Sequence, residues 1–170
     1  LANSGGTAYF PQAHLDMVRP ALMTLGYLPA LAPAPLQGIA PCFSLKSKVA
    51  YFKVVEKDAG ISYGHSYHTA CQTRIVTIPI GYGDGYRRSL SNRGQVLMRG
   101  RRFPIVGTIC MDQLMVDVKD SEVHVGDEVV LIGRQDAEKI SLEEIAQLCE
   151  TIPYEVLCLF NERIPRIYLG

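Results

Sequence analysis

Six short runs of β-branched and aromatic residues, separated by turns that contain glycine or proline, lie between residues 49 and 132. Such runs are typical of β-strands. Short strands at regular spacing, with turn signals between them, predict a mainly β domain, either a barrel or a sandwich. The six predicted strands are Val49–Val55, Ile75–Ile80, Gln95–Met98, Phe103–Val106, Leu114–Val118 and Glu128–Ile132.

A tight hairpin is predicted between the third and fourth of these strands. The segment Arg99-Gly100-Arg101-Arg102 separates them, and Gly100 can take the positive-φ position that a short hairpin turn requires. Because this basic segment lies where two strands turn, a solvated hairpin tip is favoured over a phosphate-binding patch.

A helix is predicted after the last strand, so one or two short helices are expected beside the strands. Ser141-Leu142-Glu143-Glu144 has the pattern of a capping box, in which the Ser141 hydroxyl and the Glu144 carboxylate bind each other's backbone N–H groups. Apolar residues then follow at helical spacing, which predicts one buried face. These residues are Leu142, Ile145, Ala146 and Cys149.

The first forty residues follow a different pattern. Asn3-Ser4-Gly5-Gly6 is predicted to be a turn, and the stretch from Leu28 to Pro41 is rich in proline. Because proline lacks the N–H that helices and sheets use, this stretch is interpreted as a connection between domains. The predicted domains are therefore residues 1–40 and residues 41–170.

Charge and cysteine content narrow the functional classes. Lys+Arg and Asp+Glu number 17 each, so the formal net charge is zero and neither a nucleic-acid partner nor a membrane surface is indicated. No apolar run approaches the roughly 18 residues of a membrane span. The five cysteines lack CxxC spacing, which favours reduced thiols in a cytoplasmic protein.

Three glycine-flanked segments carry reactive or polar groups at the ends of strand-like runs, where rigid scaffolds hold catalytic groups. They are Ile61-Ser62-Tyr63-Gly64, Pro79-Ile80-Gly81-Tyr82-Gly83-Asp84-Gly85 and Gly107-Thr108-Ile109-Cys110-Met111-Asp112-Gln113. Their order resembles the C-terminal half of alanine racemase, a pyridoxal-phosphate enzyme. Further matching segments are Ala2-Asn3-Ser4, Met17-Val18-Arg19-Pro20, Ile152-Pro153-Tyr154-Glu155-Val156 and Arg163-Ile164-Pro165-Arg166.

The resemblance implies a domain organisation. Residues 1–40 resemble the last strand–helix unit of a (β/α)8 barrel, and residues 41–170 resemble the C-terminal β domain of the family. The first half of such an enzyme, with the lysine that anchors pyridoxal phosphate, would precede Leu1. The chain alone is therefore expected to be inactive.

The resemblance also implies roles on the substrate side. Tyr63 is expected to be the base that takes the α-proton of L-alanine, while the other base is the lysine outside this chain. The Met111 N–H is expected to bind the substrate carboxylate, and Tyr82 to narrow the entrance. Asp112 is expected to fix its loop, and Cys110 to lie beside the substrate. Packing roles remain open for Tyr63 and Tyr82, as does a core or acid–base role for Cys110.

A tyrosine base requires assistance from its surroundings. The reference pKa of tyrosine is about 10, so reaching neutrality takes roughly 3 units, or about 4 kcal/mol, from cations or donors that favour the phenolate. His65 and His68 lie close to Tyr63 in sequence but are interpreted as solvated loop residues. The family's activating partners lie in the half that would precede Leu1.

Cofactor contacts are expected mainly from the first forty residues. Ser4 would donate to the phosphate, Ala21 and Leu22 would offer backbone N–H groups, and Tyr154 would add its hydroxyl. The family prefers glycine where Ala21 stands. Arg19 would face the pyridine nitrogen and keep it unprotonated, since a guanidinium cannot accept a proton.

Together these features predict a fragment of a pyridoxal-phosphate-dependent alanine racemase that interconverts L- and D-alanine for cell-wall synthesis. Two bases on opposite faces of the α-carbon would carry the proton transfer. The family implies a homodimer in which each C-terminal domain serves its partner's site. The alternatives are a racemase for serine or another small amino acid, and a non-catalytic β-barrel binding domain.

Overall fold

The computed structural model describes residues 1–28, 36 and 38–169. The chain forms two compact units, Leu1–Phe43 and Ser44–Gly170, which are described separately below. The predicted connection from Leu28 to Pro41 falls largely on residues outside the described part of the chain. The assignment of residues 1–40 to a barrel remnant stays a prediction.

The first unit contains short helices. They are α1 (Ser4–Tyr9) and the 3-10 helices η1 (Pro11–Ala13) and η2 (Leu22–Leu25). The turn predicted at Asn3–Gly6 is wrong, because Asn3 caps α1 by accepting a hydrogen bond from the Gly6 N–H at 2.9 Å. A parallel bridge between Ala2 and Val18 brings together the two ends of the segment that contains α1 and η1.

The second unit is built from antiparallel strands. Its main strands are β1 (Leu45–Lys48), β2 (Tyr51–Val55), β5 (Thr73–Ile78), β6 (Gln95–Met98), β7 (Arg101–Pro104), β8 (Leu114–Lys119) and β9 (Glu128–Gln135). Shorter strands are β3 (Gly60–Ile61), β4 (Tyr67–His68) and β10 (Glu138–Ile140). Each of the six predicted strands is present, with its bounds shifted by a few residues in most cases.

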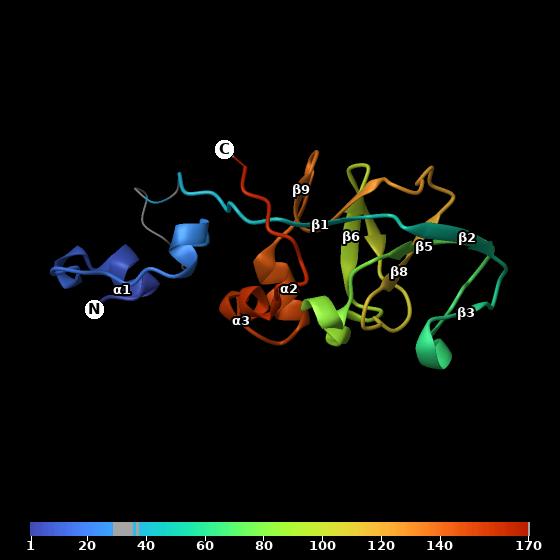
Figure 1. Ribbon diagram of the computed structural model, residues 1–170, viewed down its shortest axis with the longest axis horizontal. Coiled ribbons are helices and arrows are strands. Elements are labelled where there is room, and N and C mark those ends of the chain that lie inside the picture. The colour runs from blue at the N-terminus through green and yellow to red at the C-terminus, as the bar shows by residue number, and fades with distance from the viewer. Residues whose placement is uncertain (29–35, 37, 170) are drawn as a thin grey trace. The chain divides into compact units, whose positions relative to one another are not determined.

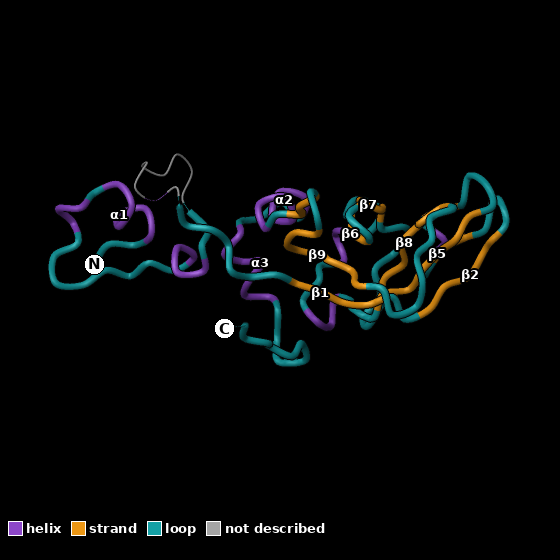
Figure 2. The backbone as a smooth tube through the Cα atoms, turned by 90° about the horizontal axis from the view of Figure 1, so that it is seen from above, coloured by secondary structure: helices purple, strands orange, loops and turns teal. Residues whose placement is uncertain are grey.

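The prediction of a mainly β domain, a barrel or a sandwich, is confirmed, and the strands close into a ring. One sheet has the order β1-β9-β6-β7 and the other β2-β5-β8. A bridge from Ile105 to Val116 joins β7 to β8. On the opposite side β1 continues into β2 (Figures 1 and 2), with the Val49 N–H bound to Asp127 O and the Ala50 N–H bound to Thr77 O. A single extended segment therefore belongs to both sheets.

Apolar side chains from both sheets fill the interior. On β6 the whole run Val96–Met98 is buried, so both faces of this strand are covered by other parts of the chain. A second buried cluster contains Ile61, Ile75 and Val106. It lies beneath the segments that precede Tyr63 and Thr108, so packing fixes the bases of both loops.

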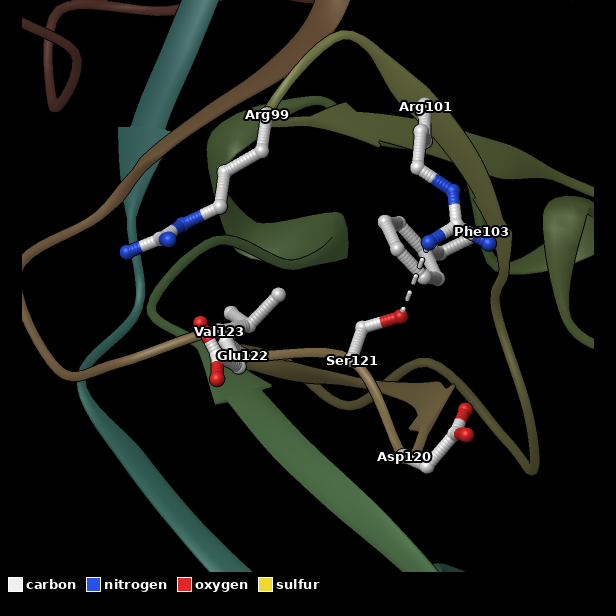
Figure 3. Close-up of a pocket in the computed structure, with 7 residues that line it drawn as sticks. All are labelled: Arg99, Arg101, Phe103, Asp120, Ser121, Glu122 and Val123. Atoms are coloured by element: carbon white, nitrogen blue, oxygen red, sulfur yellow. Dashed lines mark hydrogen bonds between the residues drawn. The ribbon is translucent and has the colours of Figure 1, made fainter.

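The β6–β7 hairpin has the predicted turn. Arg99 and Gly100 both adopt positive φ, at 49° and 67°, as a two-residue hairpin turn requires. Arg99 pairs with Asp127 at 2.8 Å. Arg99 and Arg101 extend from this hairpin beside a depression of about 410 Å³. Arg101 donates to the Ser121 hydroxyl at 3.4 Å (Figure 3).

Two helices follow the barrel strands, α2 (Leu142–Leu148) and α3 (Pro153–Leu159). The Ser141 hydroxyl caps α2 by accepting from the Glu144 N–H at 3.1 Å, as predicted. The other half of the predicted capping box is wrong: the Glu144 carboxylate does not bind the Ser141 N–H but pairs with Arg102 at 2.7 Å, which ties α2 to β7. The four residues predicted to share the inner face of α2 are all buried. Within the described part of the chain, no helix is long and apolar enough to cross a membrane.

Tyr86 places a polar group inside this apolar core. Its side chain is 1% exposed, and its hydroxyl has no hydrogen-bond partner among the described residues. Burial raises the pKa of the Tyr86 hydroxyl far above its ordinary value, with smaller contributions from the nearby Cys149 and Glu144. The hydroxyl is therefore held in its neutral form, and it contributes no hydrogen bond to stability.

Tyr86→Phe is expected to raise the free energy of unfolding by up to about 1–3 kcal/mol at neutral pH, since it removes a buried, unpaired hydroxyl. The folded protein keeps the phenolic proton while the unfolded chain releases it above about pH 10. The unsubstituted protein should thus lose up to about 1.4 kcal/mol per pH unit beyond pH 10, a loss that the variant lacks. Thermal unfolding of both proteins across this pH range measures the difference. Parallel profiles would contradict the assignment.

Candidate active site

Three loops of the second unit carry the residues predicted for the substrate side. The first contains Tyr63 and connects β3 to β4, and the second contains Tyr82 and follows β5. The third runs from Gly107 to Gln113 and leads into β8. Hydrogen bonds join the third loop, called the central loop below, to each of the other two.

The Tyr63 loop is exposed and tightly constrained. Tyr63 begins the 3-10 helix η4 (Tyr63–His65) and is 76% exposed, which does not fit a packing role. Ser62 precedes it with φ 64° and ψ −176°, a backbone region that is essentially restricted to glycine and costs about 1–3 kcal/mol for other residues. Gly64 and His65 also adopt positive φ. Two non-glycine residues with positive φ, one on each side of Tyr63, mark this loop as a functional candidate.

The central loop presents one backbone donor. Met111 is 50% exposed, and among the described residues its N–H has no hydrogen-bond partner, as the predicted carboxylate contact requires. Cys110 is 8% exposed, and its thiol lies 3.5 Å from the Ser62 hydroxyl. The Cys110 side chain is thus directed into the chain's own loops. This position fits its packing interpretation better than direct contact with a substrate.

The Tyr82 loop is bound directly to the central loop. It forms the 3-10 helix η5 (Tyr82–Asp84), and Tyr82 itself is 48% exposed. The Tyr82 N–H donates to Cys110 O at 3.0 Å, and the Gly83 N–H donates to Met111 O at 2.9 Å. These two bonds hold Tyr82 and Met111 in fixed relation, which suits residues that would share one ligand.

Asp112 is fixed by an arginine from the end of the second unit. The Arg163 guanidinium binds Asp112 and also lies 3.3 Å from Asp84, so it joins the central loop to the Tyr82 loop. The hydrogen bond with Asp112, followed by the charge of Asp84, raises the pKa of Arg163 above its ordinary value. Asn161 donates to Gly83 O at 2.8 Å. Asp112 therefore has the loop-fixing contact that was expected of it.

The sequence indicated no role for Arg163, Asn161 or Thr108, although Arg163 and Thr108 lie in recognisable motifs. Arg163 opens the segment Arg163-Ile164-Pro165-Arg166, and Thr108 follows Gly107. An arginine in a terminal motif is a signal for an ion pair, but its acidic partners lie far away in sequence. They could be identified only from the folded chain.

The residues predicted for the cofactor fall in both units. In the first, Ser4 is 3% exposed and its hydroxyl accepts from the Ala21 N–H at 3.0 Å, so these two are brought together. Leu22 is buried at the start of η2, and Arg19 lines a depression beside Ala2. In the second unit, Tyr154 is 42% exposed in the first turn of α3.

The contacts of Ser4 allow a test of the fit to a phosphate group. The Ser4 hydroxyl keeps its own O–H as a donor after accepting from Ala21, whereas the Ala21 N–H is already bound to Ser4. The first unit therefore keeps one hydroxyl donor for an anion, on the buried Ser4 side chain, with Ala21 acting as support for the serine. In the second unit, the exposed Tyr154 keeps a hydroxyl that could donate to an anion. No group of His, Cys, Asp and Glu side chains among the described residues could hold a metal ion.

The second unit is thus a closed antiparallel β domain that carries an exposed tyrosine and an exposed backbone donor on joined loops. Residues 42–168 match the family model for the alanine racemase C-terminal domain. The chain therefore belongs to this family.

Curated relatives and solved structures agree with this assignment. The alanine racemase of Symbiobacterium thermophilum is 50% identical over 99% of this chain and 45% of its own length. The alanine racemase of Halothermothrix orenii is 46% identical over 98% of this chain and 44% of its own length. The chain spans less than half the length of these relatives.

Among solved structures, alanine racemase from Bacillus anthracis with bound L-Ala-P has a TM-score of 0.92 and 40% identity, over 99% of this chain and 44% of that one. Alanine racemase from Bartonella henselae with covalently bound pyridoxal phosphate has a TM-score of 0.88 and 33% identity, over 99% of this chain and 46% of that one.

Proposed function

We propose that this chain is the C-terminal portion of a pyridoxal-phosphate-dependent alanine racemase that interconverts L- and D-alanine. The observation that carries the proposal is the exposed Tyr63 on a strained loop, tied through the central loop to the free N–H of Met111. The family match and the names of the relatives support it.

The proposed chemistry divides into binding and proton transfer. The Tyr63 side chain, as phenolate, takes the α-proton from L-alanine, and as hydroxyl it returns a proton to the same face in the reverse reaction. The Met111 N–H binds the substrate carboxylate, and Tyr82 limits the size of the side chain that enters. Pyridoxal phosphate, when bound, supplies the electron sink that makes the α-proton removable. The second base lies outside this chain.

Cofactor binding is proposed for residues of both units. In the first unit, Ser4 would donate a hydroxyl hydrogen bond to the phosphate and the backbone N–H of Leu22 would add a further donor. In the second unit, Tyr154 would offer a hydroxyl donor. Arg19 would face the pyridine nitrogen and keep it unprotonated. We further propose a homodimer in which Tyr63 and the Met111 loop serve the partner's site. The free cysteines support placement in the cytoplasm.

The proposal is tested by assaying the full-length protein, loaded with pyridoxal phosphate, for formation of D-alanine from L-alanine. L-serine and L-leucine are assayed in parallel, and we expect alanine to be turned over fastest and leucine not at all. A preference for serine would identify the related racemase instead. Cofactor binding without turnover of any small amino acid would support a non-catalytic binding domain.

A further inference from the structure

Thr108 is a buried polar residue at the start of the central loop. It is 9% exposed, and both its side chain and its backbone face the Tyr63 loop. Its hydroxyl donates to the backbone carbonyl of Tyr63 at 3.1 Å and lies 3.2 Å from the Ser66 hydroxyl. Its carbonyl accepts from the Ser62 hydroxyl at 2.6 Å. Thr108 therefore contacts the loop at Ser62 and Ser66, which are its two ends, and at the backbone of Tyr63.

The Tyr63 loop needs such an external contact. Ser62 and His65 hold positive φ although neither is glycine, so the loop would relax if nothing held it. The short strands β3 and β4 supply only two residue pairs at its base. The bonds to Thr108 are thus a main restraint on the position of the Tyr63 backbone.

Asn92 holds Thr108 and the loop from a second direction. Its side-chain oxygen accepts from the Gly107 N–H at 2.6 Å, and its amide donates to Ser66 O at 3.2 Å. The residue before Thr108 and the far end of the Tyr63 loop are therefore bound to the same side chain. Gly107 leaves room for this approach, because a Cβ there would lie 2.6 Å from Ile61 O.

We propose that Thr108 is a positioning residue for the base at Tyr63. Its hydroxyl keeps the loop in the strained conformation that sets where the tyrosine hydroxyl stands. The proposal rests on the proposed function, because it assigns Thr108 to the face of the substrate that Tyr63 serves. A residue that only filled the core would affect stability without favouring one substrate enantiomer over the other.

Thr108→Val and Thr108→Ser in the full-length protein separate these cases. Valine keeps the shape of threonine and loses the hydroxyl, whereas serine keeps the hydroxyl and loses a methyl group. Since a displacement of about 1 Å can lower a rate about 100-fold, we expect the valine variant to reduce kcat by roughly 10- to 100-fold with little change in KM. Serine should restore most of the rate, although it leaves a small gap in the core.

Exchange of the α-hydrogen with deuterated solvent provides the selective readout. With the valine variant, exchange from L-alanine should fall by the same factor as kcat, while exchange from D-alanine, which uses the other base, should persist. Equal loss from both enantiomers, or equal rates for the valine and serine variants, would overturn the proposal. Tyr63→Phe is measured alongside. If this variant did not lose exchange from L-alanine selectively, the proposed role of Tyr63 itself would be refuted.

Amide hydrogen exchange in the 170-residue chain tests the restraint without any activity. Peptides covering residues 62–66 should exchange faster in Thr108→Val than in Thr108→Ser, while β5 peptides exchange equally in both. Unchanged exchange at residues 62–66 in the valine variant would show that the hydroxyl does not hold the loop, and the proposal would fail even if Tyr63 is the base.

Discussion

Tyr63→Phe in the full-length protein is expected to abolish net interconversion of L- and D-alanine in both directions. Every turnover needs a base on each face of the α-carbon, and the variant keeps the ring but loses the group that carries the proton. A positioned acid–base group contributes about 100- to 10,000-fold, so the loss should be at least of this order. The assay is the change in optical rotation or coupled oxidation of D-alanine.

Exchange on a single face distinguishes loss of a base from general damage. The variant should still exchange the α-hydrogen of D-alanine with deuterated solvent, because that step uses only the other base, while L-alanine stays almost unlabelled. Tyr51→Phe is the matched control, since Tyr51 is also an exposed tyrosine, 59% accessible on β2. Undiminished exchange of L-alanine by the Tyr63→Phe variant would show that another residue serves that face.

Gly81→Ala is expected to cause a large loss of stability. A Cβ at Gly81 would overlap the carbonyl oxygens of Cys110 and Met111 and would lie 2.6 Å from the carbonyl carbon of Met111. These are backbone atoms, and both carbonyls are already bound by Tyr82 and Gly83. The loops must therefore separate, at a cost of roughly 3 kcal/mol or more.

The effect at Gly81 is steric, since its φ of −152° is one that alanine adopts freely. Gly38→Ala is the matched control, because a Cβ there meets nothing within 4 Å. Chemical denaturation of the two variants measures the difference in free energy of unfolding. In the full-length protein the Gly81 variant should also lose activity. Equal stability of the two variants would mean that the loops are not held together as described.

The sequence predicted those parts of the fold whose signals are local. The Gly100 turn and the Ser141 cap depend on neighbouring residues, and both are present. β1 was missed because its sequence, Leu45-Lys46-Ser47-Lys48, is polar and has no strand signal. It is a strand only because β9 pairs with it. Likewise, the glycines after Asn3 suggested a turn, whereas the asparagine side chain begins a helix.

The same distinction applies to the candidate site. The motifs identified Tyr63, Tyr82 and Met111 as separate candidates, but nothing in them indicated which backbone groups would join the loops. The bonds from Tyr82 and Gly83 to the central loop are made by main-chain atoms, which carry no residue-specific signal. Thr108 escaped notice for a related reason, since a threonine in a strand-rich chain is ordinarily a packing residue.

The segment that belongs to both sheets also bears on the order of folding. The β6–β7 hairpin joins near neighbours in the chain, whereas the pairing of Leu45 with Ile132 requires the ends of the barrel sequence to meet. Contacts between distant residues form late, because loop entropy must be lost first. Closure of the barrel by pairing of β1 with β9 should therefore be a late event. We expect it to come after the pairing of β5 with β8, which supports the tyrosine loops. A chain arrested before closure would already hold these loops near one another, while the edge of β9 remained open to pairing with a second molecule.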